Sequence, residues 1–147
     1  MAAYLIDTNV LVRAADPEAA KHSVADLAMQ RLLSEGQPCF LTPQVIVEFW
    51  AVATRPRPAN GLGWTSAQTK DATDRLLRQI PLLEETPRIF PHWLSLVAAQ
   101  GIVGKRVHDA RLVAVMQAHQ VTHLLTFNTA DFPTSFGVVA LSPEEVA

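Results

Sequence analysis

Short apolar runs alternate with stretches of helical periodicity along most of the chain. A strand that is covered on both faces is apolar at successive positions, so each run predicts a buried strand. The predicted strands span residues 4–6, 39–41, 82–83 (a weak signal), 123–126 and 137–141. Strands that alternate with helices indicate the α/β class. We therefore expect a three-layer α/β/α sandwich around a central, mainly parallel sheet.

Between these runs, apolar residues recur at helical spacing, and typical end signals bracket the helices. Thr42 precedes a proline at the first helical position, and Gly36 and Gly101 follow the ends of two helices. The predicted helices span residues 9–15, 19–34, 43–54, 66–79, 87–99 and 108–119. Residues 55–63 are rich in proline and glycine, which predicts a mobile surface loop.

The length and composition of the chain predict one globular domain over residues 1–147. The chain has 147 residues, 49% of them hydrophobic and 18% charged, which is too apolar for intrinsic disorder. Its net charge is only −2, and domains that bind nucleic acid are usually basic, so charge alone does not predict such binding. A bound metal ion would change this expectation, because it inverts the local field of an acidic pocket.

Cysteine content and hydropathy indicate where the protein resides. The single cysteine, Cys39, allows no disulfide within the chain and no zinc site built from Cys and His. The N-terminus lacks the pattern of a signal peptide, and no apolar run approaches the ~20 residues of a membrane span. We expect a soluble, cytoplasmic protein with no membrane association.

Four acidic residues stand where an apolar residue or a simple cap would be ordinary. Asp7 ends the first strand, Glu48 interrupts the apolar helix 43–54, Asp109 lies above the buried stripe of its helix, and Asp131 follows the strand 123–126. Carboxylates that all point inward are costly unless a cation holds them together. Ligands of parallel sheets bind beyond the carboxyl ends of the strands, where these residues can converge. The pattern predicts a divalent metal site and metal-assisted hydrolysis of a phosphate ester.

Each of these residues also has an ordinary structural explanation. Asp7 could be an N-cap, and Asp109 an acid that the helix dipole favours. Glu48 could lie at the rim of its helix, and Asp131 and Asn128 could be turn residues. Taken singly each residue fits either explanation, and the prediction of a metal site rests on their joint occurrence in this order.

The joint pattern resembles the PIN-domain family, and most of all the VapC-type toxins of bacterial toxin–antitoxin pairs. The motifs that carry the resemblance are Leu-Ile-Asp-Thr-Asn at 5–9, Glu48 in its helix, His-Asp-Ala-Arg-Leu at 108–112 and Leu-Thr-Phe-Asn-Thr-Ala-Asp-Phe at 125–132. They cover residues 5 to about 141, which is nearly the whole chain.

The resemblance implies an Mg²⁺- or Mn²⁺-dependent endoribonuclease that acts as the toxin of a type II pair. It implies an RNA substrate, a cognate antitoxin that enters the active-site groove, and a homodimer. Matched position by position, the acidic quartet is Asp7, Glu48, Asp109 and Asp131. The supporting polar residues are Thr8, Asn9, Thr126 and Asn128. Carboxylates are hard ligands that suit these cations, and we expect Asp7 and Asp109 to hold the metal directly or through water.

Cations outside an acidic site must guide RNA toward it. The candidates are Arg13, Arg55, Arg57, Lys105, Arg106 and Arg111. Each of them taken singly could equally be an ordinary solvated surface charge.

Other assignments fit less well. A haloacid-dehalogenase phosphatase needs a second aspartate two residues after the first, where this chain has Asn9. A receiver domain needs an acidic pair near its first strand and a phosphoacceptor at its third, and neither is present. A PIN-like module that binds RNA or protein without cutting is the alternative that stays open.

Overall fold

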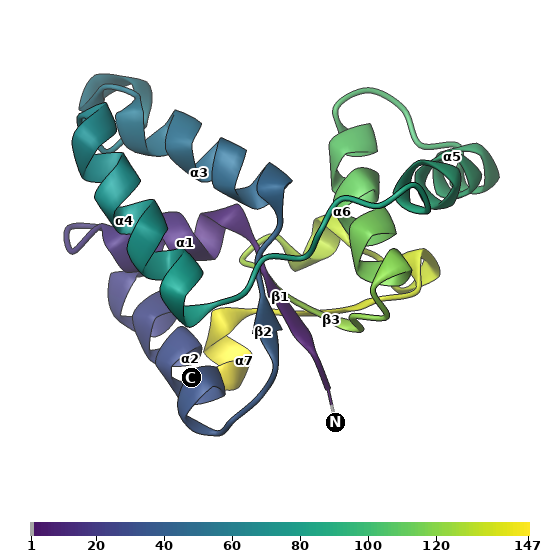
Figure 1. Ribbon diagram of the computed structural model, residues 1–147, viewed down its shortest axis with the longest axis horizontal. Helices are drawn as coiled ribbons and strands as arrows, with labels where there is room; N and C mark the ends of the chain where they lie inside the picture. The colour runs from purple at the N-terminus through teal and green to yellow at the C-terminus, as the bar shows by residue number, and fades with distance from the viewer. Residues whose placement is uncertain (1) are drawn as a thin grey trace.

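The computed structural model describes residues 2–147, and at its centre lies a parallel sheet of four strands (Figure 1). The strands are β1 (Tyr4–Ile6), β2 (Cys39–Phe40), β3 (His123–Leu125) and β4 (Val139–Leu141), in the order β2-β1-β3-β4. The chain leaves β1 toward β2 on one side, while β3 lies on the other side. The strand order therefore reverses between β1 and β3, which is where ligands of such sheets bind.

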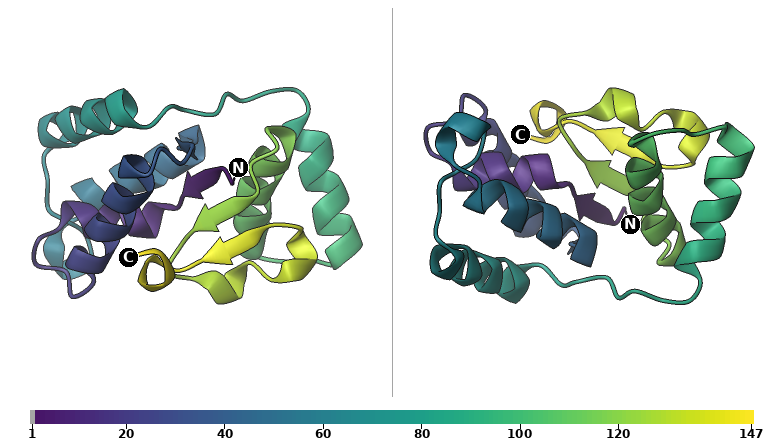
Figure 2. Two further views of the ribbon diagram at one scale, coloured as in Figure 1. Left: turned by 90° about the horizontal axis from the view of Figure 1, so that it is seen from below. Right: turned by 90° about the horizontal axis from the view of Figure 1, so that it is seen from above.

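Helices cover both sides of this sheet. They are α1 (Thr8–Ala15), α2 (His22–Ser34), α3 (Pro43–Thr54), α4 (Ser66–Gln79), α5 (Ile89–Gln100), α6 (Arg106–Ala118) and α7 (Pro143–Val146). Helices α1 to α4 and α7 gather on one side, and α5 and α6 on the other; both views in Figure 2 show this division. The predicted α/β/α sandwich is confirmed. No helix within residues 2–147 combines the length and the apolar character needed to cross a membrane.

The core explains why the central elements form where they do. Leu5, Leu124 and Leu125 of the two inner strands are completely buried, as expected for strands with helices on both faces. Residues 112–116 of α6 are buried without interruption, because this helix packs between the sheet and α5. The sheet and α6 thus form a rigid base for the residues at the strand ends.

Several predicted boundaries differ from the structure. The weak strand at 82–83 is wrong: Leu82 forms only an isolated parallel bridge with Leu41. Pro81 precedes it and has no N–H with which to extend a ladder. Gly137, at φ +81°, ends a 3-10 turn, so β4 begins only at residue 139. Residues 17–21 form turns ahead of α2, and the short helix α7 was not predicted.

The proline- and glycine-rich stretch 55–63, predicted to be a mobile surface loop, makes hydrogen bonds to the end of α3. Its backbone folds back on the end of α3, where the Leu62 amide donates to the Val52 carbonyl at 3.1 Å and the Trp64 amide to the Ala53 carbonyl at 2.9 Å. Leu62 is buried, and Trp64 meets the ring of Phe49 edge-on at 6.1 Å. The stretch is an anchored turn that extends the end of α3.

Candidate active site

Strand register places Asp7 beside Thr126. In the parallel pair β1–β3, Ile6 lies opposite Leu125, so the next residue of each strand meets its counterpart at the same edge. The Thr126 hydroxyl donates to Asp7 Oδ2 at 2.9 Å, and the Asp7 amide donates to the Leu125 carbonyl at 3.0 Å. Thr126 is completely buried and Asp7 is 9% exposed, so this contact lies in the interior.

Asp7 is at the same time the N-cap of α1. Its Oδ1 accepts from the Thr8 amide at 2.8 Å, and the helix dipole favours a negative charge at this position. Its Oδ2 also accepts from Asn9 Nδ2 at 3.3 Å. The ordinary explanation as a cap and the functional one are therefore both compatible with the structure.

Asn9 links α1 to the loop after β3. Its Nδ2 donates to Thr126 Oγ1 at 3.1 Å, and its Oδ1 accepts from the Phe127 amide at 2.9 Å. Asn128 joins this network through its backbone, since its amide donates to Thr126 Oγ1 at 3.1 Å. All four supporting residues predicted from sequence lie close to the acids, and Asn128 makes its hydrogen bond with main-chain rather than side-chain atoms.

Helix α3 brings Glu48 to the same place. Glu48 Oε2 accepts from the buried Thr8 hydroxyl at 3.1 Å, and Glu48 Oε1 accepts from Gln44 Nε2 at 3.3 Å. Gln44 was not predicted as part of the site. The available signal was its position four residues before Glu48, which puts both side chains on one face of α3.

The other two acids come from the opposite side of the sheet. Asp109 lies in the first turn of α6 and is half-buried. Asp131 ends the 3-10 turn Thr129–Asp131, and its carbonyl accepts from Arg106 Nη2 at 2.7 Å. The expectation that all four acids point inward is wrong, because Asp131 and Glu48 are exposed. Both come from the rim of the site, and only Asp7 follows directly from a buried strand.

The charges of the four acids influence one another. The pKa of Asp7 is raised from its usual 3.8 to about 6, first by burial and to a lesser extent by the charges of Glu48 and Asp109, against the opposing hydrogen bonds from Thr126 and Thr8. The pKa of Asp109 is also raised, first by burial and then by the charge of Asp131. Arg106 opposes part of that rise. Four carboxylates from separate segments therefore repel one another here.

The donor set suits a hard, hydrated cation. None of the four carboxylates forms an ion pair within the part of the chain that the structure describes. Nor do residues 2–147 contain a group of three or more His, Cys, Asp or Glu that is arranged to hold a metal ion. Mg²⁺ commonly binds through one or two carboxylates and keeps several waters, so it needs no such cage. Of the four acids, Asp7 and Asp109 are the more buried, and their carboxylate oxygens are available to such an ion.

The structure divides the predicted RNA-guiding cations into groups. Arg57 is paired with Asp16 at 3.3 Å and with Glu18 at 3.2 Å. Arg111 is paired with Glu85 at 2.8 Å, and these two arginines are thus already engaged by acids. Ion pairing therefore makes both of them weaker candidates.

Two other arginines border the acids. Arg13 donates to the Asn9 carbonyl at 3.2 Å and lies 4.6 Å from the centre of the Phe127 ring. Arg106 lies 5.7 Å from the ring of Phe136 and close enough to Asp109 to lower its pKa. Lys105 precedes α6 and is exposed, and Arg55 lies at the far end of α3.

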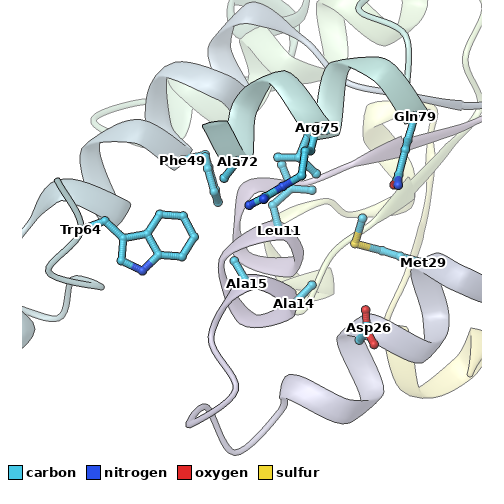
Figure 3. Close-up of a pocket in the computed structure, with 11 residues that line it drawn as sticks. Leu11, Ala14, Ala15, Asp26, Met29, Phe49, Trp64, Ala72, Arg75 and Gln79 are labelled. Carbon is cyan, nitrogen blue, oxygen red and sulfur yellow. The ribbon is translucent and has the colours of Figure 1, made fainter. Parts of the chain in front are cut away.

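A cavity of about 410 Å³ lies elsewhere, between α1, α2, α3 and α4 (Figure 3). Trp64, Phe49 and Leu11 line it, and the guanidinium of Arg75 extends across it. None of the four acids is among its lining residues. The acids are therefore not part of this hollow.

Comparison with known families identifies the fold. A family model described as PIN domain matches residues 4–133. The chain belongs to the PIN domain family. The family resemblance seen in the motifs is thereby confirmed, although a search of curated proteins finds no sequence match.

Solved structures share the PIN fold at low sequence identity. VapBC2 from Rickettsia felis, bound to a DNA fragment from its promoter, has a TM-score of 0.70 at 15% identity, covering 95% of this chain and 97% of that one. VapBC-1 from nontypeable Haemophilus influenzae has 0.68 at 15%, covering 96% and 98%. The sarcin–ricin loop cleaving toxin VapC20 from Mycobacterium tuberculosis has 0.66 at 20%, covering 93% and 97%.

Proposed function

We propose that this PIN domain is a metal-dependent endoribonuclease and the toxin of a type II toxin–antitoxin pair, acting on RNA in the cytoplasm. One observation carries the proposal: four carboxylates from separate segments, Asp7, Glu48, Asp109 and Asp131, are electrostatically coupled at the edge between β1 and β3. Repulsion of this kind destabilises an empty site and is relieved by a divalent cation. The likeness to a toxin that cleaves the sarcin–ricin loop supports RNA as the substrate class.

In this mechanism the acids divide into two roles. Asp7 and Asp109 would hold Mg²⁺ or Mn²⁺, while Glu48 and Asp131 would hold its coordinated waters. When bound, the ion supplies a water of lowered pKa and stabilises charge on the scissile phosphate. Asp7 is oriented by the Thr126 hydroxyl and the Thr8 amide, and Glu48 by the Thr8 hydroxyl. Thr8 therefore touches both acids and couples their positions.

Two protein partners belong to the proposal. A cognate antitoxin would block the acidic edge, in keeping with the toxin–antitoxin complexes that share the fold. A homodimer would cover the apolar outer face of α5, where Phe90 is 64% and Leu94 50% exposed. Light scattering should then give a dimer mass for the wild type and a monomer mass for the double variant Phe90→Glu/Leu94→Glu. The control Leu27→Glu, on α2, should keep the dimer mass.

The test is cleavage of total cellular RNA by the purified protein with Mg²⁺ or Mn²⁺, with chelator, and by the variant Asp7→Asn. Discrete fragments that require both the metal and Asp7 support the nuclease, and their ends define the target.

A folded protein that binds RNA equally well in chelator and does not cut it would instead be a non-catalytic binding module.

A further inference from the structure

Gln44 joins two of the acids through a single amide group. It lies in the first turn of α3, and its Nε2 donates to Glu48 Oε1 at 3.3 Å and to the His108 carbonyl at 3.0 Å. Residue 108 directly precedes Asp109 in the first turn of α6. One NH₂ group thus contacts a carboxylate on α3 and the backbone beside a carboxylate on α6.

These two helices have little else that connects them directly. Helix α3 belongs to the group on one side of the sheet and α6 to the group on the other (Figures 1 and 2). Over residues 2–147, the contact from Gln44 to the His108 carbonyl is the one hydrogen bond that joins α3 to α6, and no ion pair joins them. Among direct polar contacts between these two helices, the relative placement of Glu48 and Asp109 therefore depends on this amide.

The other atom of the same amide argues against a purely stabilising role. Gln44 Oε1 is buried and has no hydrogen-bond partner. A buried acceptor without a partner destabilises the folded state. An apolar side chain of the same length would avoid this cost, so the benefit of glutamine here lies in the two bonds that its NH₂ group donates.

A neutral donor also suits the electrostatics of the site. Glu48 is exposed and its charge raises the pKa of Asp109, so repulsion drives the two carboxylates apart. An arginine at position 44 would hold Glu48 by cancelling its charge, which would compete with a divalent cation. An amide can hold it while leaving the full negative charge for the ion.

We propose that Gln44 is a positioning residue that holds Glu48 and Asp109 at the spacing a shared divalent cation requires. The inference rests on the proposed metal-dependent function and adds a residue to it. Loss of a side chain that orients metal ligands typically lowers metal affinity or activity by roughly 10- to 100-fold.

The test compares Gln44→Met with a matched control, Gln30→Met. Gln30 donates to Asp26 one turn away on the exposed side of α2, so it forms a similar glutamine–carboxylate pair outside the site. Mn²⁺ affinity is measured without RNA, from the spin-resonance signal of the free ion. We expect Gln44→Met to weaken Mn²⁺ binding roughly 10- to 100-fold, with faster amide exchange over residues 104–112. The melting temperature of the metal-free protein should stay equal or rise, and Gln30→Met should match the wild type.

Two results would overturn the inference: unchanged Mn²⁺ affinity in Gln44→Met, or weaker binding with a clear fall in the metal-free melting temperature, which would mark a structural role. Failure of the proposed function looks different. A wild-type protein that binds Mn²⁺ but cuts no RNA contradicts the nuclease and leaves the Mn²⁺ comparison able to support Gln44. A wild-type protein that binds no Mn²⁺ contradicts both.

Discussion

Asp7 is a helix cap in the fold and a metal-binding carboxylate in the proposed function. As the N-cap of α1 it satisfies a backbone amide, which on its own is a stabilising contact. As a carboxylate that is only 9% exposed and lies near two other acids, it is destabilising when charged. The balance between these effects depends on pH.

The variant Asp7→Asn should be more stable than the wild type near neutral pH. The pKa of Asp7 is raised from 3.8 to about 6 in the folded state, so its protonated form favours folding below about pH 3.8 and that stability is lost as the pH rises through 6. The full difference is about 3 kcal/mol at 1.36 kcal/mol per pKa unit. An amide does not titrate, so the advantage of Asp7→Asn should grow between pH 4 and 7.

Urea unfolding of both metal-free proteins at several pH values measures this advantage, and RNA cleavage by the variant should be abolished. A variant that is less stable at every pH would mean that Asp7 serves the fold alone.

Thr126 is the buried partner that holds Asp7 in place. The variant Thr126→Val removes the hydroxyl that donates to Asp7 and accepts from Asn9 and from the Asn128 amide. Because polar groups then stay buried without partners, we expect a loss of about 1–3 kcal/mol of stability. Cleavage should fall by roughly tenfold or more, since each 1.4 kcal/mol lost from transition-state stabilisation is tenfold.

Thr126→Ser is the matched control, since it keeps the hydroxyl and removes only a methyl group. Its rate of cleavage should stay close to that of the wild type. Equal rates for the valine and serine variants would exclude a role for the hydroxyl.

At the scale of elements, the turn after α3 depends on Gly61. A Cβ at this position would lie 1.9 Å from the Arg55 carbonyl oxygen, which is far inside contact distance with backbone that cannot move easily. We expect Gly61→Ala to lower the free energy of unfolding by at least about 2 kcal/mol, because the turn must open to relieve the clash. Chemical denaturation measures the loss.

Gly36→Ala provides the comparison. Gly36 has φ +71° but no atom within 4 Å of an added Cβ, so that variant bears only the conformational strain of about 1–2 kcal/mol. If Gly61→Ala were the milder of the two, the anchored turn would be mobile in solution after all.

Most elements could be predicted from the sequence, and the errors have identifiable causes. Apolar periodicity located six of the seven helices; two of them match at both ends, and the ends of the others differ by at most three residues. The strand at 82–83 failed because two apolar residues after a proline cannot be told from a bridge by pattern alone. The stretch 55–63 was predicted to be a mobile loop because proline and glycine mark turns. Composition does not reveal that the Leu62 side chain is buried in the core.

At the scale of the whole molecule, charge distribution matters more than net charge. The chain carries −2 overall, so in the proposed function RNA would reach the acidic edge through local cations. Arg13 and Arg106 border that edge, whereas Arg57 and Arg111 are already paired with acids. Cleavage should therefore fall steeply with added salt, because RNA binding releases counterions.

The same cations give a graded set of variants. Arg13→Gln and Arg106→Gln should each raise the KM for RNA. Each should also reduce the slope of log affinity against log salt concentration by about one. Arg57→Gln and Arg111→Gln should change both very little, since each of these arginines is already paired with an acid. A flat salt response in the wild type, or equal effects of all four variants, would contradict guidance by the two arginines beside the acids.

The sequence by itself determined the α/β class, the main elements and the four acidic positions, because periodicity and strand ends are local properties that a short window contains. Only the tertiary structure decided that Thr126 donates to Asp7 across 119 residues of chain, since that contact depends on the register of β1 against β3. It also decided that Glu48 and Asp131 are exposed, and that Gln44 reaches the backbone beside Asp109. Such facts depend on how distant segments pack, and no local pattern encodes that packing.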